Sequence, residues 1–216
     1  MVIRPTDWSV VIAGRWNRAI LTPAGIAKRL FNISESSQIL VAVPLDGLSP
    51  YQVRHQGHDI VAMTDENRLI ILATRNTYEN MAHAMGAGVN ALEALPETPV
   101  TAAGYNISFH SEESAPPLAA LLAAPVDDVV AELGKSVEGR SITRSLAYEG
   151  GTLNITFAGD KTGFKLQCNF NKDSKDIKDL ISWLKSPVAG AQQIVDQLVA
   201  KLGLQIEDAK YDDDGQ

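Results

Sequence analysis

Short connections between apolar segments are the feature that most constrains how this chain can fold. Between residues 38 and 73, four segments of strand length follow one another and are separated by only a few residues. The connections carry Asp46-Gly47, Gln56-Gly57 and Asp65-Glu66-Asn67, which are typical turn residues. Parallel strands need a crossover of about a dozen residues or more, whereas antiparallel strands can be joined by tight turns. The spacing therefore predicts an antiparallel meander.

A helix is predicted directly after the last of these strands. Apolar residues recur three and four positions apart, which places them on one helix face; they are Tyr78, Met81, Met85, Val89 and Leu92. Asn76 is expected to cap the helix, with Glu79 returning a hydrogen bond to the cap, and Pro96 ends it. A further strand is predicted at 100–109. Its apolar alternation changes phase, which predicts a β-bulge or sharp bend at Gly104.

The N-terminal segment repeats the same building blocks. The apolar, β-branched run Trp8–Ala13 predicts a buried strand. Ala19-Ile20-Leu21 is expected to be a second, short extended piece. Thr22-Pro23 then predicts a helix start, because threonine is a good N-cap and proline fits the first helical position.

The second half is predicted to carry three strands joined by hairpin turns, at 141–148, 152–158 and 163–170. Two short helices are expected before them, at 118–124 and 126–133, interrupted by Pro125. Two more helices are expected after them, beginning near Asp173 or Ser174 and at Ser186-Pro187. Strands first and helices afterwards is the order of an α+β fold.

The predicted fold is thus α+β with two lobes, each a mainly antiparallel meander sheet packed against helices. The predicted boundaries are 1–110 for the N-terminal lobe and 118–206 for the C-terminal lobe. The polar, proline-bearing segment 111–117 is the expected linker. The acidic segment 207–216 is expected to be a disordered tail.

The charge of the chain is uneven and excludes some partners. Residues 1–110 hold 8 basic and 9 acidic side chains, and residues 111–216 hold 11 basic and 17 acidic ones, giving net charges of −1 and −6. Nonspecific binding to nucleic acid or to anionic lipid needs a net basic surface. We therefore expect no nucleic-acid partner and no membrane partner.

The composition favours the cytoplasm. The hydrophobic fraction of 45% and the charged fraction of 21% are ordinary for a globular protein. No apolar run approaches the roughly 20 residues that span a bilayer, and the first residues lack the pattern of a secretory signal. Cys168 is the single cysteine, so an internal disulfide is excluded.

The segment Gly14-Arg15-Trp16-Asn17-Arg18 is the best ligand-binding candidate. Two arginines beside a tryptophan and an asparagine, at the end of a strand, can stack on a ring and hold an anion. In the alternative interpretation, which we favour, strand alternation sends Trp16 into the core while Arg15 and Asn17 face outward.

A second candidate, for a metal ion, is His55-Gln56-Gly57-His58. Two imidazoles across a tight turn can share an ion, but a metal site needs further ligands. His83 and His110 are available, yet nothing in the sequence places them nearby. We favour a surface hairpin that happens to carry two histidines, and expect no cofactor.

No catalytic residue can be assigned from the sequence. Cys168 alternates with Phe164, Leu166 and Phe170, which indicates a buried thiol that acts as a small apolar group. No serine lies in a nucleophile-elbow motif and no phosphate-binding loop follows a strand. Gly86-Ala87-Gly88 lies within the predicted helix, so it is interpreted as a place of close packing. Scattered carboxylates give no support for a two-carboxylate mechanism.

Two functions remain as hypotheses. The first is a non-catalytic module that binds another protein or associates with itself, with no cofactor. The second is a small-molecule or anion-binding protein, possible also as an enzyme, that uses Arg15, Trp16, Asn17 and Arg18.

Overall fold

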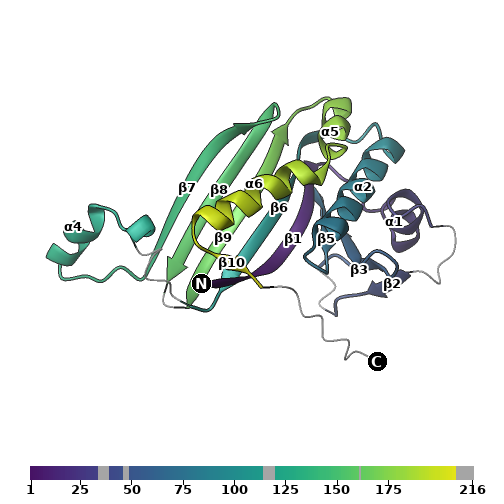
Figure 1. Cartoon of the computed structure of the whole chain (residues 1–216). Helices are drawn as coiled ribbons and strands as arrows, with labels where there is room; N and C mark the ends of the chain where they lie inside the picture. The colour runs from purple at the N-terminus through teal and green to yellow at the C-terminus, as the bar shows by residue number, and fades with distance from the viewer. Residues whose placement is uncertain (34–38, 46–48, 114–119, 161, 208–216) are drawn as a thin grey trace.

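The computed structural model describes residues 1–33, 39–45, 49–113, 120–160 and 162–207. Within this part of the chain, ten strands form one sheet in the order β2-β3-β4-β5-β1-β6-β9-β8-β7, with β10 paired to β1 (Figure 1). The strands are β1 (Val2–Gly14), β2 (Ile39–Ala42), β3 (Gln52–His55), β4 (Ile60–Thr64), β5 (Arg68–Ala73), β6 (Val100–Ser111), β7 (Gly139–Tyr148), β8 (Gly151–Asp160), β9 (Gly163–Asp173) and β10 (Gln205–Ile206). The described helices are α1 (Pro23–Arg29), α2 (Tyr78–Ala94), α4 (Val126–Glu132), α5 (Ile177–Leu184) and α6 (Val188–Lys201).

The predicted α+β class and the antiparallel meanders are confirmed. All neighbouring strands along the main path are antiparallel, and β1 with β10 is the parallel pair. The finer prediction of two lobes is not confirmed, because β6 pairs with β1 on one side and with β9 on the other, and one sheet therefore crosses both halves. The predicted linker begins at Ser111, the last residue of β6, and its positions 114–117 lie outside the described residues.

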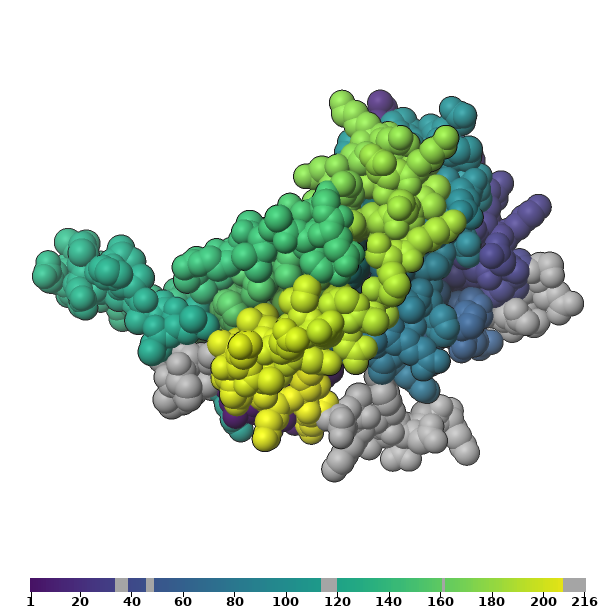
Figure 2. All heavy atoms as spheres, turned by 45° about the horizontal axis from the view of Figure 1, so that its top comes forward, coloured from purple at the N-terminus to yellow at the C-terminus, as the bar shows by residue number. Residues whose placement is uncertain are grey.

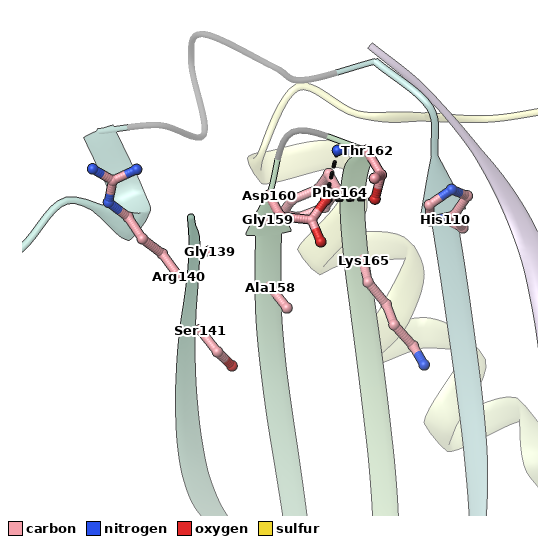
Figure 3. A pocket seen from close by; sticks show the side chains of 11 residues that line it. His110, Gly139, Arg140, Ser141, Ala158, Gly159, Asp160, Thr162, Phe164 and Lys165 are labelled. Atoms are coloured by element: carbon pink, nitrogen blue, oxygen red, sulfur yellow. Dashed lines mark hydrogen bonds between the residues drawn. The ribbon is translucent and has the colours of Figure 1, made fainter. Parts of the chain in front are cut away.

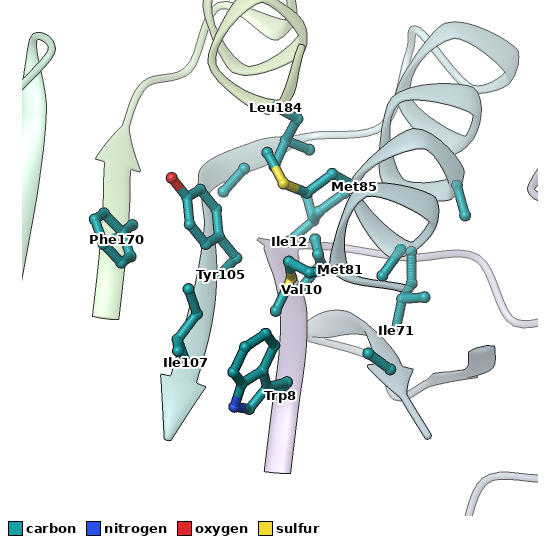
Figure 4. Close-up of a cluster of buried hydrophobic side chains, with 14 of the residues drawn as sticks. Trp8, Val10, Ile12, Ile71, Met81, Met85, Tyr105, Ile107, Phe170 and Leu184 are labelled. Carbon is teal, nitrogen blue, oxygen red and sulfur yellow. The ribbon is translucent and has the colours of Figure 1, made fainter. Parts of the chain in front are cut away.

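One face of the sheet carries the helices and the core. Figure 4 shows Trp8, Val10 and Ile12 of β1 pointing toward α2, and Tyr105 of β6 beside Phe170 of β9. The Tyr105 and Phe170 rings stack with centroids 4.8 Å apart. These side chains are fully or almost fully buried. Alternation along each strand thus sends the apolar positions to the helix side, as the sequence pattern predicts.

The opposite face carries a continuous row of polar side chains across five strands. Ser145 of β7 donates to Asn154 of β8 at 2.7 Å, and Asn154 donates to Asn169 of β9 at 3.2 Å. Asn169 donates to Asn106 of β6 at 2.9 Å, and Asn106 donates to Ser9 of β1 at 3.2 Å. Each such bond contributes about 0.5–1.5 kcal/mol net. The row links strands of both halves of the chain in one register.

The cap of α2 differs from the prediction. Thr77 is the N-cap, and its hydroxyl accepts a hydrogen bond from the backbone N–H of Asn80 at 3.2 Å. The Asn76 side chain accepts from the backbone N–H of Trp8 and donates to the carbonyl of Pro5. Asn76 therefore ties β1 to the start of α2, because a long-range partner competes with the local cap.

The predicted bulge at Gly104 is wrong in position. The β6–β9 register runs through Gly104 without interruption, and the β1–β6 register shifts between Ala102 and Val100 instead, where β6 has one residue more than β1. The change of phase is therefore real but lies at Thr101. Gly104 serves close approach: a Cβ there would lie 2.4 Å from the carbonyl oxygen of Phe170.

Most of the remaining elements agree with the predictions. The helix expected to begin near Asp173 or Ser174 begins at Ile177, with Asp176 as its N-cap. Positions 118–119 of the helix expected at 118–124 lie outside the described residues. Thr22 caps α1 by accepting from Gly25 N–H at 3.1 Å, and Pro23 is its first residue. The strands β7, β8 and β9 and the helices α4, α5 and α6 are confirmed. The expected extended piece at 19–21 is wrong, because the backbone N–H groups of Ile20 and Leu21 both donate to the carbonyl of Asn17 and close a turn.

Two glycines give opposite predictions for stability. At Gly86 in α2 an added Cβ meets nothing within 4 Å, so Gly86→Ala should raise the free energy of unfolding by about 0.5–1 kcal/mol through helix propensity. Gly104→Ala should lower it by at least about 2 kcal/mol, since a backbone oxygen lies in the way. Urea denaturation of both variants measures the difference. Equal effects of the two substitutions would contradict this account.

Candidate functional site

β7 forms a long and exposed edge of the sheet. It pairs with β8 over all ten of its residues, and its other side has no partner strand in the described part of the chain. Every residue of β7 except Ile142 and Tyr148 is exposed. The other edge, β2, has only four residues. An edge strand presents a row of backbone donors and acceptors to which another strand can bind. β7 is the longer template of the two.

The helix α4 lies next to this edge and buries none of its residues. Figures 1 and 2 show it projecting from the body of the molecule near the start of β7. Val126, Val129 and Leu133 are three and four positions apart, and their exposed fractions are 60%, 54% and 71%. A helix of seven residues is not stable from its backbone bonds alone. Its unpartnered apolar side chains indicate a contact surface.

An ion pair connects α4 to β7. Nε of Arg140 in β7 lies 2.7 Å from a carboxylate oxygen of Asp127 in α4, and the hydrogen bond from Arg140 is the main reason why the pKa of Asp127 is lowered. Asp128 and Glu132 add further negative charge to α4, and Arg144 adds positive charge to β7. The helix is therefore acidic and the edge strand basic. We name α4 and β7 together the β7–α4 surface.

A hollow of about 410 Å³ opens beside this surface, at the ends of β6, β7, β8 and β9 (Figure 3). Its charged and titratable lining residues are His110, Arg140, Asp160 and Lys165. Asp160 accepts hydrogen bonds from the backbone N–H and the hydroxyl of Thr162, and these bonds lower its pKa. Asp160 thus closes its own turn. The side chain of Arg140 points toward α4, so the lining offers charge but no nucleophile with a matched base.

The structure places the predicted ligand-binding residues Arg15, Trp16, Asn17 and Arg18 around another hollow, of about 530 Å³, together with Glu66 and Asn67. Trp16 itself is only 4% exposed, and its ring N–H donates to the carbonyl of Ile12 at 3.0 Å. The core interpretation of Trp16 is confirmed. Asn17 accepts from the backbone N–H of Ala19. The side chains of Arg15 and Arg18 are therefore the main groups of this hollow that can bind a ligand.

The predicted pair His55 and His58 is joined by a third histidine that sequence reasoning left unplaced. The ring centroids of His55 and His58 are 4.4 Å apart, and those of His58 and His83 are 4.1 Å apart. His83 comes from α2, far along the chain, and no local pattern signals this contact. His110 lines the hollow at the other end of the sheet. In the part of the chain that the structure describes, no group of three or more ligand side chains has the arrangement of a metal site.

Comparison with protein-family models and with curated proteins gives no relative from which a function can be transferred. No protein-family model matches the sequence, and no curated protein matches it significantly. Among the described residues, no helix is both long and apolar enough to cross a bilayer. The site residues must therefore be judged from their geometry.

Cys168 should be unreactive in the folded protein. Its side chain is fully buried, and burial raises the pKa of the thiol to about 12. The thiolate that reacts with disulfide reagents is thus nearly absent at neutral pH. Ellman's reagent should label none of the thiol within an hour in buffer and one thiol per chain in 6 M guanidinium chloride. Rapid labelling of the native protein would contradict the structure.

Proposed function

We propose that this protein is a self-associating, non-catalytic module whose β7–α4 surface binds a second copy of the chain. The observation that supports this proposal is the unpartnered apolar stripe of α4 beside a ten-residue open edge. Two antiparallel edge strands extend one sheet into the next by backbone hydrogen bonds, and apolar contacts then add affinity. The module thereby covers surface that is costly to leave in water.

Charge supports a second copy as the occupant. The acidic α4 of one protomer can lie against the basic β7 of its partner, and the reverse contact forms at the same time in a two-fold arrangement. The ion pair of Arg140 with Asp127 within one chain supports such contacts, because groups of the same kind would meet across the two-fold axis. Lys165, in the neighbouring hollow, adds positive charge on the same side as β7. A strongly acidic or basic foreign partner would match only one half of this surface.

The test is the mass of the protein in solution. Size-exclusion chromatography with light scattering at 1–100 µM should give twice the 23.3 kDa chain mass at the upper concentrations. Val129→Glu and Leu133→Glu place charge in the contact. Each should raise the dissociation constant of the dimer at least about tenfold. Both side chains are exposed, so the variants should fold as the parent does.

The matched control is Leu45→Glu. Leu45 is a fully exposed apolar residue next to β2, at the opposite edge of the sheet. The substitution Leu45→Glu should leave the dissociation constant of the dimer unchanged. A monomer at every concentration would overturn self-association. Loss of the dimer in Leu45→Glu, with none in Val129→Glu, would move the interface to the β2 edge.

The second candidate function is binding of a small anion in the hollow beside Arg15 and Arg18. Both side chains are exposed, and no described carboxylate forms an ion pair with either. Guanidinium groups bind phosphates and carboxylates in two-pronged geometry. Glu66 lines the same hollow and opposes an anion, which places this function after the first.

Thermal unfolding in inorganic phosphate and in citrate tests the anion site. A ligand present at a hundred times its dissociation constant adds about 2.7 kcal/mol to the free energy of unfolding. This should raise the melting temperature by roughly 5–10 °C. Arg15→Gln with Arg18→Gln should abolish the rise, and Lys178→Gln, an exposed cation on α5, should keep it. The same rise in the double variant would exclude this site.

A further inference from the structure

Three of the four histidines of the chain form one column, which we name the histidine stack: His55 of β3, His58 of the β3–β4 turn and His83 of α2. The stack connects the turn between β3 and β4 to the helix that covers the sheet. His55 also contacts the ring of Phe31, which follows α1, with centroids 5.3 Å apart. The stack therefore joins α1, α2 and the β3–β4 hairpin at one place.

The turn depends on a neutral imidazole. Nδ1 of His55 accepts a hydrogen bond from the backbone N–H of Gly57 at 3.0 Å. An imidazole nitrogen can accept only while it carries no proton. Protonation of Nδ1 would set one N–H against another and break the bond that closes the turn.

Charged groups near the stack offer an imidazolium little compensation. The nearest carboxylate in the turn is that of Asp59, and it already pairs with Arg54 at 3.2 Å and with Arg75 at 3.0 Å. Lys28 and Arg29, in the last turn of α1, are cations. β4 has no titratable residue. Glu79, one turn before His83 on α2, is exposed to solvent.

These surroundings favour the neutral forms. Burial, followed by the neighbouring His58, lowers the pKa of His55, and burial and His83 lower the pKa of His58. A histidine whose pKa is lower in the folded than in the unfolded chain stabilises the fold fully above its unfolded value of about 6.5. That contribution is lost as the pH falls below this value, because the unfolded chain then binds more protons than the folded one.

We propose that the histidine stack is an acid-sensitive contact that holds the β3–β4 turn against α2 and releases it when two neighbouring imidazoles are protonated. Because β3 lies between β2 and β4, release of the turn loosens the edge strand β2 as well. The β7–α4 surface lies at the far edge of the sheet and is not affected. The inference is independent of the proposed function, since no residue of the stack lies on that surface.

Hydrogen exchange read by mass spectrometry at pH 7.5 and pH 5.5, corrected for intrinsic exchange rates, tests this directly. Between pH 7.5 and pH 5.5, the protection factors of peptides from 52–64 should fall at least about tenfold more than those of peptides from β8 and β9. A tenfold difference corresponds to a pKa that differs by one unit between the folded and the open state. His58→Gln with His83→Gln should reduce this difference, because His55 then lacks its neighbouring imidazoles and keeps only the effect of burial. His58 is exposed and His83 is only partly buried, so the double variant should fold.

The fourth histidine provides the matched control. His110→Gln removes an imidazole of the same kind from the other end of the sheet, and it should keep the full local effect of acid. A uniform loss of protection across all strands would overturn the proposal, and so would an unchanged acid effect in the double variant. If the double variant is destabilised, the single variant His83→Gln should still reduce the pH difference, because the His58–His83 pair is then absent.

Discussion

The pairing of β6 with both β1 and β9 is the interaction on which the rest of the structure depends. β6 comes from the first half of the chain and β9 from the second, and their ten paired positions join the two meanders into one sheet. Tyr105 and Phe170 stack across this junction on the helix side, and Asn106 bonds to Asn169 on the other side. Both faces therefore fix the same register, because a slip by one residue would exchange the apolar and polar faces.

The junction also explains where unsatisfied surface remains. A single sheet has only two edges, and the short strand β2 lies at one of them while β7 lies at the other. The helices α2, α5 and α6 pack near the middle of the sheet, where the apolar positions are most concentrated. α4 buries none of its residues and keeps Val126, Val129 and Leu133 exposed to solvent. An open edge with an exposed apolar helix beside it is a surface that another chain can cover.

The histidine stack follows from the same architecture. α2 crosses β1, β5 and β4, and this brings His83 to the turn after β3. The protein thus has two chemically different regions at opposite edges. One presents unpaired backbone groups and exposed apolar side chains, which we propose for a second copy, and the other contains the imidazoles of the proposed acid-sensitive contact. In this proposal a change of pH acts on the second region and leaves the first unchanged.

Local patterns predicted most helices and strands, because alternation, turn residues and helix caps act between neighbours in the chain. They predicted the burial of Trp16 and Cys168 for the same reason. They failed where a partner lies far away in the sequence: Asn76 bonds to β1 and leaves the cap to Thr77. The phase change in β6 was visible, but its place at Thr101 depends on the register with β1.

The candidate sites divide in the same way. The arginines 15 and 18 and the pair His55 and His58 are close in sequence, so their proximity could be predicted. The third histidine and the exposed state of α4 could not, since each depends on how elements from distant parts of the chain pack. The sequence by itself determined which segments become strands and helices and which face of each is apolar. Only the tertiary structure decided that the two halves share one sheet and which edges stay open, because strand pairing selects partners that no local pattern specifies.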